Sequence, residues 1–460
     1  MQEEESEDGF SLYEFYMNHN KKSKIAVEGV NRKPKEDFCF WNKLCSDVED
    51  VFDEETGFAT QPERRIGHSA VYLAGTDEIY IFGGRESEDL CDMWSFHIPT
   101  REWTEFYAKS RTECWPSPMF DHTAVSISLS RKRFEKFLMR YPEIGKLSDL
   151  QQDENCFPFV EKFYNQMYIF GGYNSSKHFS NDLYCYDFTF KKFIKIEYTG
   201  KESEMIMERS RHCMVSVKDQ YLYIIGGMTD KSKTLMDVWE YDIDRNVMKC
   251  LSKHSDQYSE SFPNSRTYHS CVYSKLNHSI YMFGGIRNNE AFQDLWRFDL
   301  RALQWFPIDN MKGFVPVERF RHNCFIPNEE SGYFFVYGGY NFRHSFLDYI
   351  YQFDFSTLEW TRLQNRNYTQ GGDFQSKGSL MFVDYDEIPC ARSGMTSIIT
   401  KSGDLIIFGG KSVTCLNDMF SCRLPGYSKL RAGRHNLLME KMYQKLHSAD
   451  SFVDITFQMN

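Results

Sequence analysis

The stretch IYMFGGIRNNEAFQDLWRFDLRALQWFPI, residues 280–308, decides the fold. An apolar run ends in Gly284 and Gly285, Trp296 follows a polar loop, and Trp305 lies nine residues further on. Glycine weakens a strand interior, so an adjacent pair indicates a backbone geometry that side chains would obstruct. The same order recurs six times along the chain, which identifies a repeat protein.

Each copy contains the same landmarks in the same order. The paired glycines are Gly83, Gly84, Gly171, Gly172, Gly226, Gly227, Gly284, Gly285, Gly338, Gly339, Gly409 and Gly410. A polar segment, usually with histidine, precedes each pair, and an acidic residue with an aromatic or aliphatic neighbour follows it. A later bulky residue completes most copies, for example Trp103, Trp305 and Trp360. These landmarks predict four short strands per copy, with large side chains on the third and fourth.

The ordered landmarks resemble the kelch repeat over nearly the whole chain. This resemblance implies an all-β fold, a six-bladed kelch β-propeller within residues 31–428. The expected blades span about 62–106, 115–197, 205–252, 262–309, 316–364 and 388–428. A four-stranded sheet cannot bury both of its faces alone, so blades stack around an axis with aromatic side chains between them. The paired glycines and the tryptophans are therefore interpreted as structural.

The sixth copy lacks its last strand, because a proline and a glycine follow Asp418 where a tryptophan is expected. Near the other end of the chain, Trp41 lies in DFCFWNKL and matches the tryptophan strands of complete copies. We predict that residues 37–44 supply the missing strand, because a closed ring has no unpaired strand edges. The alternative is a loose leader with one chance tryptophan. Residues 1–30 are acidic and polar, and we expect them to be disordered.

Two further segments depart from the repeat. Residues 130–165 carry apolar residues at helical spacing among basic ones, which predicts either an insertion packed on the propeller or a partner-binding arm. Residues 429–460 resemble the start of a BTB domain, with a helix followed by an edge strand. Kelch repeats before a BTB segment resemble the leucine-zipper-like transcriptional regulator family. That resemblance implies a substrate-recognition propeller for a cullin-3 ubiquitin ligase, with small GTPases as clients. Cullin-3 binding would require a complete BTB domain.

The composition argues against several classes of function. A net charge of −11 is unlike general nucleic-acid binding, and no run of apolar residues is long enough to predict a membrane span. The acidic N-terminus is unlike a signal peptide, and the 13 cysteines lack paired spacing, so we expect free thiols in the cytoplasm or nucleus. Histidines recur at one position in five copies, which favours a structural role over a channel-lining ring or a copper site. We expect no catalytic, cofactor or metal site.

These patterns favour a protein-binding module. The candidate contacts are arginines near the starts of first strands and aromatic residues after the paired glycines: Arg65, Arg211, Arg266, Arg321, Arg392, Tyr173, Tyr340 and Phe342. Converging arginines would form a basic funnel for an acidic peptide. Alternatively, each arginine forms hydrogen bonds within its own repeat. Three functions remain distinct hypotheses, namely a ligase adaptor, a scaffold in cytoskeletal, polarity or Ras-type signalling, and, more weakly, a kelch-fold enzyme.

Overall fold

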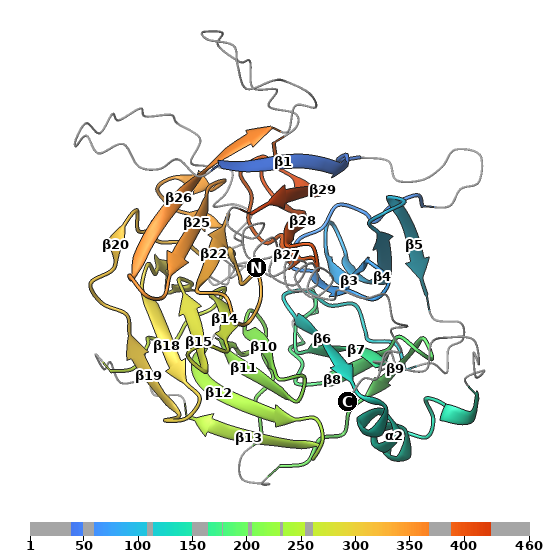
Figure 1. Cartoon of the computed structure of the whole chain (residues 1–460). Coiled ribbons are helices and arrows are strands. Elements are labelled where there is room, and N and C mark those ends of the chain that lie inside the picture. The colour runs from blue at the N-terminus through green and yellow to red at the C-terminus, as the bar shows by residue number, and fades with distance from the viewer. Residues whose placement is uncertain are drawn as a thin grey trace, which may run out of the picture. The chain divides into compact units, whose positions relative to one another are not determined.

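The structure is a computed structural model that describes residues 38–48, 59–107, 114–149, 164–176, 178–200, 205–230, 233–253, 261–367 and 388–424. Their strands form six blades that follow one another around a centre, as the colour sequence in Figure 1 shows. The predicted all-β, six-bladed propeller is therefore confirmed. The predicted leader (1–30) and the BTB-like segment (429–460) lie outside the described residues.

Each blade pairs its strands antiparallel, from the innermost strand outward. Blade I consists of β2 (Ser69–Leu73), β3 (Glu78–Arg85), β4 (Asp89–His97) and β5 (Glu102–Phe106). Blade II consists of β6 (Thr123–Leu129), β7 (Tyr164–Phe170), β8 (Leu183–Asp187) and β9 (Lys192–Lys195). Blade III consists of β10 (Cys213–Val217), β11 (Tyr221–Met228), β12 (Thr234–Asp242) and β13 (Val247–Ser252). Blade IV consists of β14 (Ser270–Ser274), β15 (Ser279–Phe283), β18 (Leu295–Asp299) and β19 (Gln304–Pro307). Blade V consists of β21 (Asn323–Phe325), β22 (Tyr333–Tyr337), β25 (Ile350–Asp354) and β26 (Glu359–Asn367). Blade VI consists of β27 (Thr396–Ile399), β28 (Asp404–Lys411), β29 (Cys415–Arg423) and β1 (Phe38–Cys45). Shorter elements are β16 (Ile286–Arg287), β17 (Glu290–Ala291), β20 (Lys312–Gly313), β23 (Tyr340–Asn341), β24 (Ser345–Phe346), the 3₁₀ turn η1 (Leu147–Asp149) and the helix α2 (Arg131–Arg140).

The N-terminal strand closes the ring, as predicted. Strand β1 runs antiparallel to β29, with Trp41 opposite Cys422, and lies beside it in Figure 1. The Trp41 side chain is fully buried, and its ring centroid lies 5.5 Å from that of Tyr337 in blade V. Strand β1 also pairs in parallel with the end of β26, which joins blades V and VI into one sheet. The sequence did not predict this second pairing.

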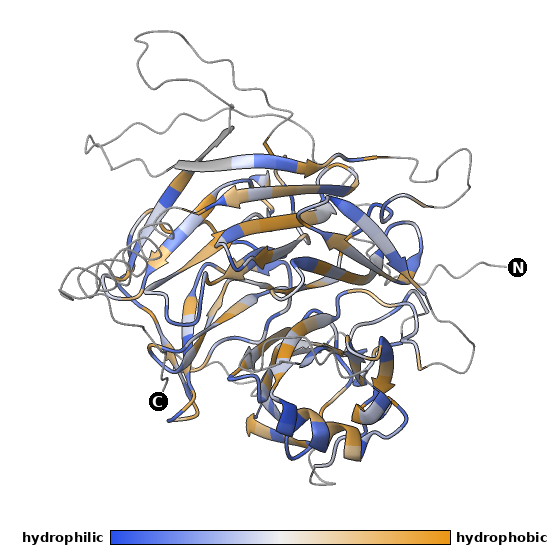
Figure 2. Ribbon diagram, turned by 45° about the vertical axis from the view of Figure 1, so that its right-hand side comes forward, coloured by the Kyte–Doolittle hydropathy of each residue, from blue (hydrophilic) through white to orange (hydrophobic). Residues whose placement is uncertain are grey.

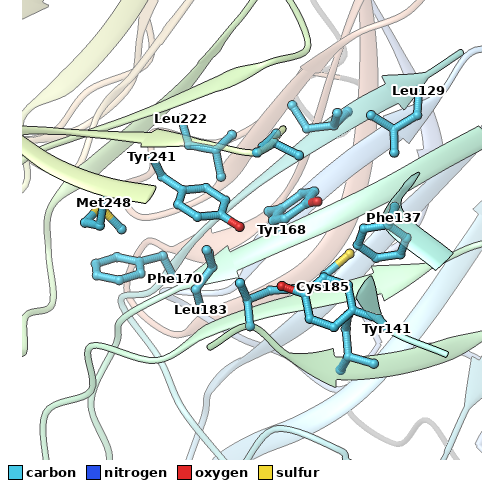
Figure 3. Packing of buried hydrophobic residues seen from close by; sticks show 14 of the residues in the cluster. Leu129, Phe137, Tyr141, Tyr168, Phe170, Leu183, Cys185, Leu222, Tyr241 and Met248 are labelled. Atoms are coloured by element: carbon cyan, nitrogen blue, oxygen red, sulfur yellow. The ribbon is translucent and has the colours of Figure 1, made fainter. Parts of the chain in front are cut away.

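Aromatic side chains fill the spaces between adjacent blades. The outer strand of one blade contacts the second strand of the blade before it, as Trp103 does with Phe408 (5.4 Å) and Trp360 with Phe283 (5.4 Å). Between blades II and III, Tyr168 and Tyr241 lie 6.4 Å apart within the cluster shown in Figure 3. Hydrophobic stretches accordingly run along the strands within the blades (Figure 2). Such pairs bury large areas and stabilise blade stacking.

The paired glycines leave room for the recurrent histidine side chains, which pack where adjacent blades meet. A β-carbon on Gly284 (φ +64°) would lie 2.6 Å from the carbonyl oxygen of Arg319 and 2.7 Å from Cε1 of His322, both in the next blade. A β-carbon on Gly285 (φ +98°) would lie 2.9 Å from the β-carbon of His269 in its own blade. The first glycine therefore admits the next blade's histidine, and the second admits the histidine of its own blade.

Replacing Gly284 with alanine is expected to destabilise the protein by about 3 kcal/mol. The positive φ accounts for roughly 1–2 kcal/mol and the contact with backbone of the next blade for the rest. Gly332→Ala is the matched control, since nothing lies within 4 Å of a β-carbon there and its φ is ordinary. Urea unfolding of both variants measures the difference; equal losses of stability would contradict this account of the paired glycines.

The insertion after β6 forms α2, which packs on the propeller. Its Phe134, Phe137 and Leu138 are buried against the core between blades II and III. Arg133 Nε donates to Asp244 of blade III over 2.8 Å, and Arg140 donates to the backbone carbonyls at 243 and 244 over 3.1 and 2.9 Å. The structure thus shows the packed alternative for this part of the insertion.

Candidate functional site

The arginines that lie four residues before the first strands form their contacts within their own blades. Five of them have no exposed surface: Arg65, Arg209, Arg266, Arg319 and Arg392. Arg65 donates two hydrogen bonds of 2.7 Å to the carboxylate of Asp92 and one of 3.0 Å to the carbonyl of Gly83. Arg266 and Arg392 hold Asp294 and Asp418 in the same way. Three of the predicted partner contacts, at positions 65, 266 and 392, therefore have the own-repeat role that was the stated alternative.

Two positions further along the chain, each blade contributes a residue to the lining of a cavity at the end of the central channel, and the residue after it, a histidine or Met395, lines the same cavity. The first residues of these pairs, here called the channel ring, are Gly67, Asp121, Arg211, Tyr268, Arg321 and Gly394. All six have φ between 53° and 68°, a conformation that is costly for residues other than glycine. Each backbone N–H donates to the carbonyl of the ring residue in the preceding blade, over 2.8–3.4 Å, and the bonds form a closed circle. This circle of hydrogen bonds holds side chains from different blades at the same level along the propeller axis.

The polar side chains of the channel ring converge on one carboxylate oxygen. Oδ2 of Asp121 accepts hydrogen bonds from Tyr268 Oη (2.7 Å), Arg211 Nε (3.3 Å) and Arg321 Nη2 (3.5 Å). Arg321 also donates to Tyr268 Oη, and its guanidinium lies 3.9 Å from the centre of that ring. The ring lines a cavity of about 120 Å³. Blades II to V thus build a site with two cations and one anion.

Burial and charge set the protonation states of this site. Burial raises the pKa of Tyr268 above its ordinary range, although Arg211 and Arg321 oppose the shift, so its hydroxyl stays protonated. Burial lowers the pKa of Arg211, but Tyr268 and Asp121 more than offset this and raise it. The site therefore offers two guanidinium groups and one phenol as donors at neutral pH, which suits a carboxylate ligand.

The predicted aromatic contacts lie around the same end of the channel. The hydroxyl of Tyr173 accepts a hydrogen bond from Arg211 Nη2 over 3.1 Å. Tyr340 and Phe342 pack on Phe320, at centroid distances of 5.5 and 5.4 Å, and Phe320 lies 6.3 Å from Tyr268. Five of the eight predicted contacts, at positions 173, 211, 321, 340 and 342, are thus gathered here.

Sequence reasoning missed Asp121 and Tyr268, although a signal for both was present. Each lies directly before the recurrent histidine, at a position that holds Gly, Asp, Arg, Tyr, Arg and Gly in successive copies. The five recurrent histidines line the same cavity, where they are almost fully buried, and they also contact the neighbouring blade; His122 Nε2 and the Ser69 hydroxyl, for instance, are 2.9 Å apart. In the described part of the chain, no helix is long and apolar enough to cross a membrane, and no three side chains are clustered as metal ligands.

The six blades define a class of fold, the six-bladed β-propeller, and the comparisons show similarity to kelch-repeat domains. A family model described as the KLHDC2/KLHL20/DRC7 Kelch-repeats domain matches residues 159–385. The chain is 22% identical to Kelch domain-containing protein 10 of Xenopus tropicalis over 310 residues, 60% of this chain and 72% of that protein. It is 24% identical to Kelch domain-containing protein 3 of Mus musculus over 279 residues, 58% of this chain and 60% of that protein. The human Kelch domain-containing protein 10 matches at 23% over 38% of this chain and 37% of that protein.

Proposed function

We propose that this propeller is a protein-recognition module that binds a carboxylate-bearing segment of a partner at the channel ring. The observation that carries the proposal is the site's own carboxylate, because Asp121 is held by donors from blades III, IV and V. The same donors are suited to a carboxylate from outside. Two arginines for one aspartate leave an excess positive charge at this end of the channel.

The proposed wider role is that of a substrate-recognition propeller in a BTB/cullin-3 ubiquitin ligase adaptor, acting in the cytoplasm or nucleus on signalling proteins such as small GTPases. The kelch-type match and the BTB-like residues 429–460 support it. In such an adaptor the propeller holds the client, while cullin-3 is bound through a complete BTB domain. No chemical step is assigned to the propeller itself.

Arg321→Gly tests the recognition role without removing the fold. Glycine already occupies the channel ring in blades I and VI, so relief of the positive φ, about 1 kcal/mol, offsets part of the lost ion pair. We expect a melting temperature within a few degrees of the wild type. In affinity capture with the full chain, followed by mass spectrometry, the variant should lose proteins that the wild type retains.

The control for this capture is Arg131→Gln on α2, whose side chain is 69% exposed and pairs with Glu135. It should retain the same proteins as the wild type. Recovery of cullin-3 or a ubiquitinated client with a BTB-containing full-length chain would support the adaptor role, and its absence would favour a scaffold. Identical capture by Arg321→Gly and wild type would contradict recognition at the channel ring.

A further inference from the structure

Four blades contain an internal guanidinium clamp with a fixed set of partners. In blade III, Arg209 donates to both carboxylate oxygens of Asp237 over 2.7 and 2.8 Å. It also donates to the carbonyl of Gly226 over 3.0 Å and to that of Met207, two residues earlier, over 3.1 Å. The clamp therefore consists of a carboxylate, the first glycine's carbonyl and the carbonyl two residues before the arginine.

Blade II retains the acceptor groups of the clamp but has a methionine where the other blades have the arginine. Met119 occupies the position three residues before His122, where blade III has Arg209 before His212. The carboxylate remains as Asp182, which pairs with Lys195 Nζ over 2.8 Å. Methionine has no donors, so it cannot replace the guanidinium.

A cavity of about 280 Å³ lies at this place in blade II. Its lining includes Ser117, Met119, Gly172 and Asp182, which are the clamp positions or their direct neighbours. Its volume is at the small end for ligand sites and suits a single side chain rather than a large molecule.

The walls of the cavity also suit a planar cation. Tyr173 and Phe179 both line it, and their rings stack at 5.1 Å and 16°. In blade IV, the internal Arg266 lies 4.2 Å from the centre of the Phe292 ring, so a guanidinium on an aromatic face already occurs in this fold. Guanidinium groups stack on aromatic rings and bind carboxylates through two parallel hydrogen bonds, which an ammonium cannot do.

We propose that the blade II cavity binds an arginine side chain presented by a partner protein. The guanidinium would pair with Asp182, as Arg209 does with Asp237, and lie against the aromatic wall. Lys195 now pairs with Asp182, but its side chain is 42% exposed and can move aside into water. The cavity is separate from the channel ring, although Tyr173, which lines the cavity, accepts a hydrogen bond from Arg211 of the ring.

The probe for this site is N-acetyl-arginine amide, compared with its citrulline and lysine analogues. Methyl NMR of the full chain with ¹³C-labelled methionine gives a direct reporter, because Met119 lines the cavity. We expect a saturable shift of the Met119 methyl signal with the arginine probe, and at least tenfold weaker binding of the other two. An unmoved Met119 signal, or equal binding of citrulline, would overturn the proposal.

Two variants and one control separate binding from folding. Asp182→Asn should weaken binding at least tenfold while the chain stays folded. Met119→Arg should fill the cavity with an internal guanidinium, abolish binding and raise the melting temperature, because it completes the clamp. Glu330→Gln, at an exposed ion pair with Lys275, should change neither.

The results can be told apart from those for the channel ring. Arg321→Gly should leave binding of the arginine probe unchanged, whereas it should weaken binding of carboxylate-bearing partners. A Met119→Arg chain that melts below the wild type, or that still binds the probe, would show that the cavity is not equivalent to the clamp and would overturn the proposal.

Discussion

Lowering the pH from 7 to 5 is expected to remove about 10 kcal/mol of stability and to unfold the propeller cooperatively. Burial lowers the pKa of His122 to about 4 and that of His269 to about 3. Burial also lowers the pKa of His68, His212 and His322 well below the ordinary value of 6.5. The unfolded chain therefore binds more protons than the folded chain once the pH falls below 6.5. Each histidine then contributes a loss of about 1.4 kcal/mol per pH unit, roughly 7 kcal/mol per unit for all five.

The pH window distinguishes these histidines from the ion-paired carboxylate of Asp294. Burial raises the pKa of Asp294, but Arg266 more than offsets this and holds it below the ordinary value of 3.8. The stability that this carboxylate contributes is therefore lost only below the window from pH 6.5 to 5. Urea unfolding at several pH values gives the number of protons taken up on unfolding.

A variant that removes one histidine provides the matched test. Blade VI carries Met395 at the histidine position, so His322→Met copies a side chain that the fold already accepts. Its stability should fall less steeply with pH, by about 1.4 kcal/mol per unit. Arg131→Gln on the surface, which removes no group that titrates between pH 5 and 7, should leave the slope unchanged. A stability that stays level between pH 7 and 5.5 would contradict the account of five neutral histidines.

Replacing Arg266 with methionine is expected to destabilise the protein by about 3–5 kcal/mol. The guanidinium has no exposed surface and holds Asp294, while it also donates to the carbonyls of Gly284 and Asn264, each over 2.9 Å. Removing it leaves Asp294, whose side chain is 38% exposed, with the hydrogen bond from Trp296 Nε1 (2.7 Å) and with water in place of the guanidinium. The cost therefore combines the lost charge pairing with the two carbonyls that lose their donor, each worth about 1–3 kcal/mol.

The double variant Arg266→Met with Asp294→Leu should recover part of that loss, because no charge then remains unpaired. Arg131→Met is the surface control and should change stability by less than about 1 kcal/mol. Urea unfolding of the wild type, Arg266→Met, Asp294→Leu and the double variant completes a double-mutant cycle. A loss below about 1 kcal/mol for Arg266→Met would contradict the structural role of the clamp.

The blade architecture could be predicted from the sequence because its causes are local and repeated. The paired glycines, the alternating apolar strands and Trp41 each indicate a local structure that depends mainly on residues close to them in the sequence. The parallel pairing of β1 with β26 could not be predicted, because nothing in the repeat requires β26 to continue past its blade. The insertion helix was visible from its spacing, but its contacts with Asp244 and residue 243 depend on blade III.

The candidate site was only partly visible from the sequence. The sequence around Arg65 and Arg211 does not distinguish their roles. Only the fold shows that Arg65 lies inside a blade and that Arg211 lies at the propeller axis. Asp121 and Tyr268 are 147 residues apart, and the ring of backbone bonds brings them together. Met119 was a visible departure from the arginine pattern, yet its meaning required the internal clamp of the other blades.

The most direct test of the account is a calorimetric titration of a glutamate-rich peptide into wild type, Arg211→Gly and Arg321→Gly, with Arg131→Gln as control. We expect the wild type and Arg131→Gln to bind with equal affinity. Each channel variant should bind at least tenfold more weakly, a difference of about 1.4 kcal/mol, while remaining folded. Equal affinity for all four chains would contradict carboxylate recognition at the channel ring.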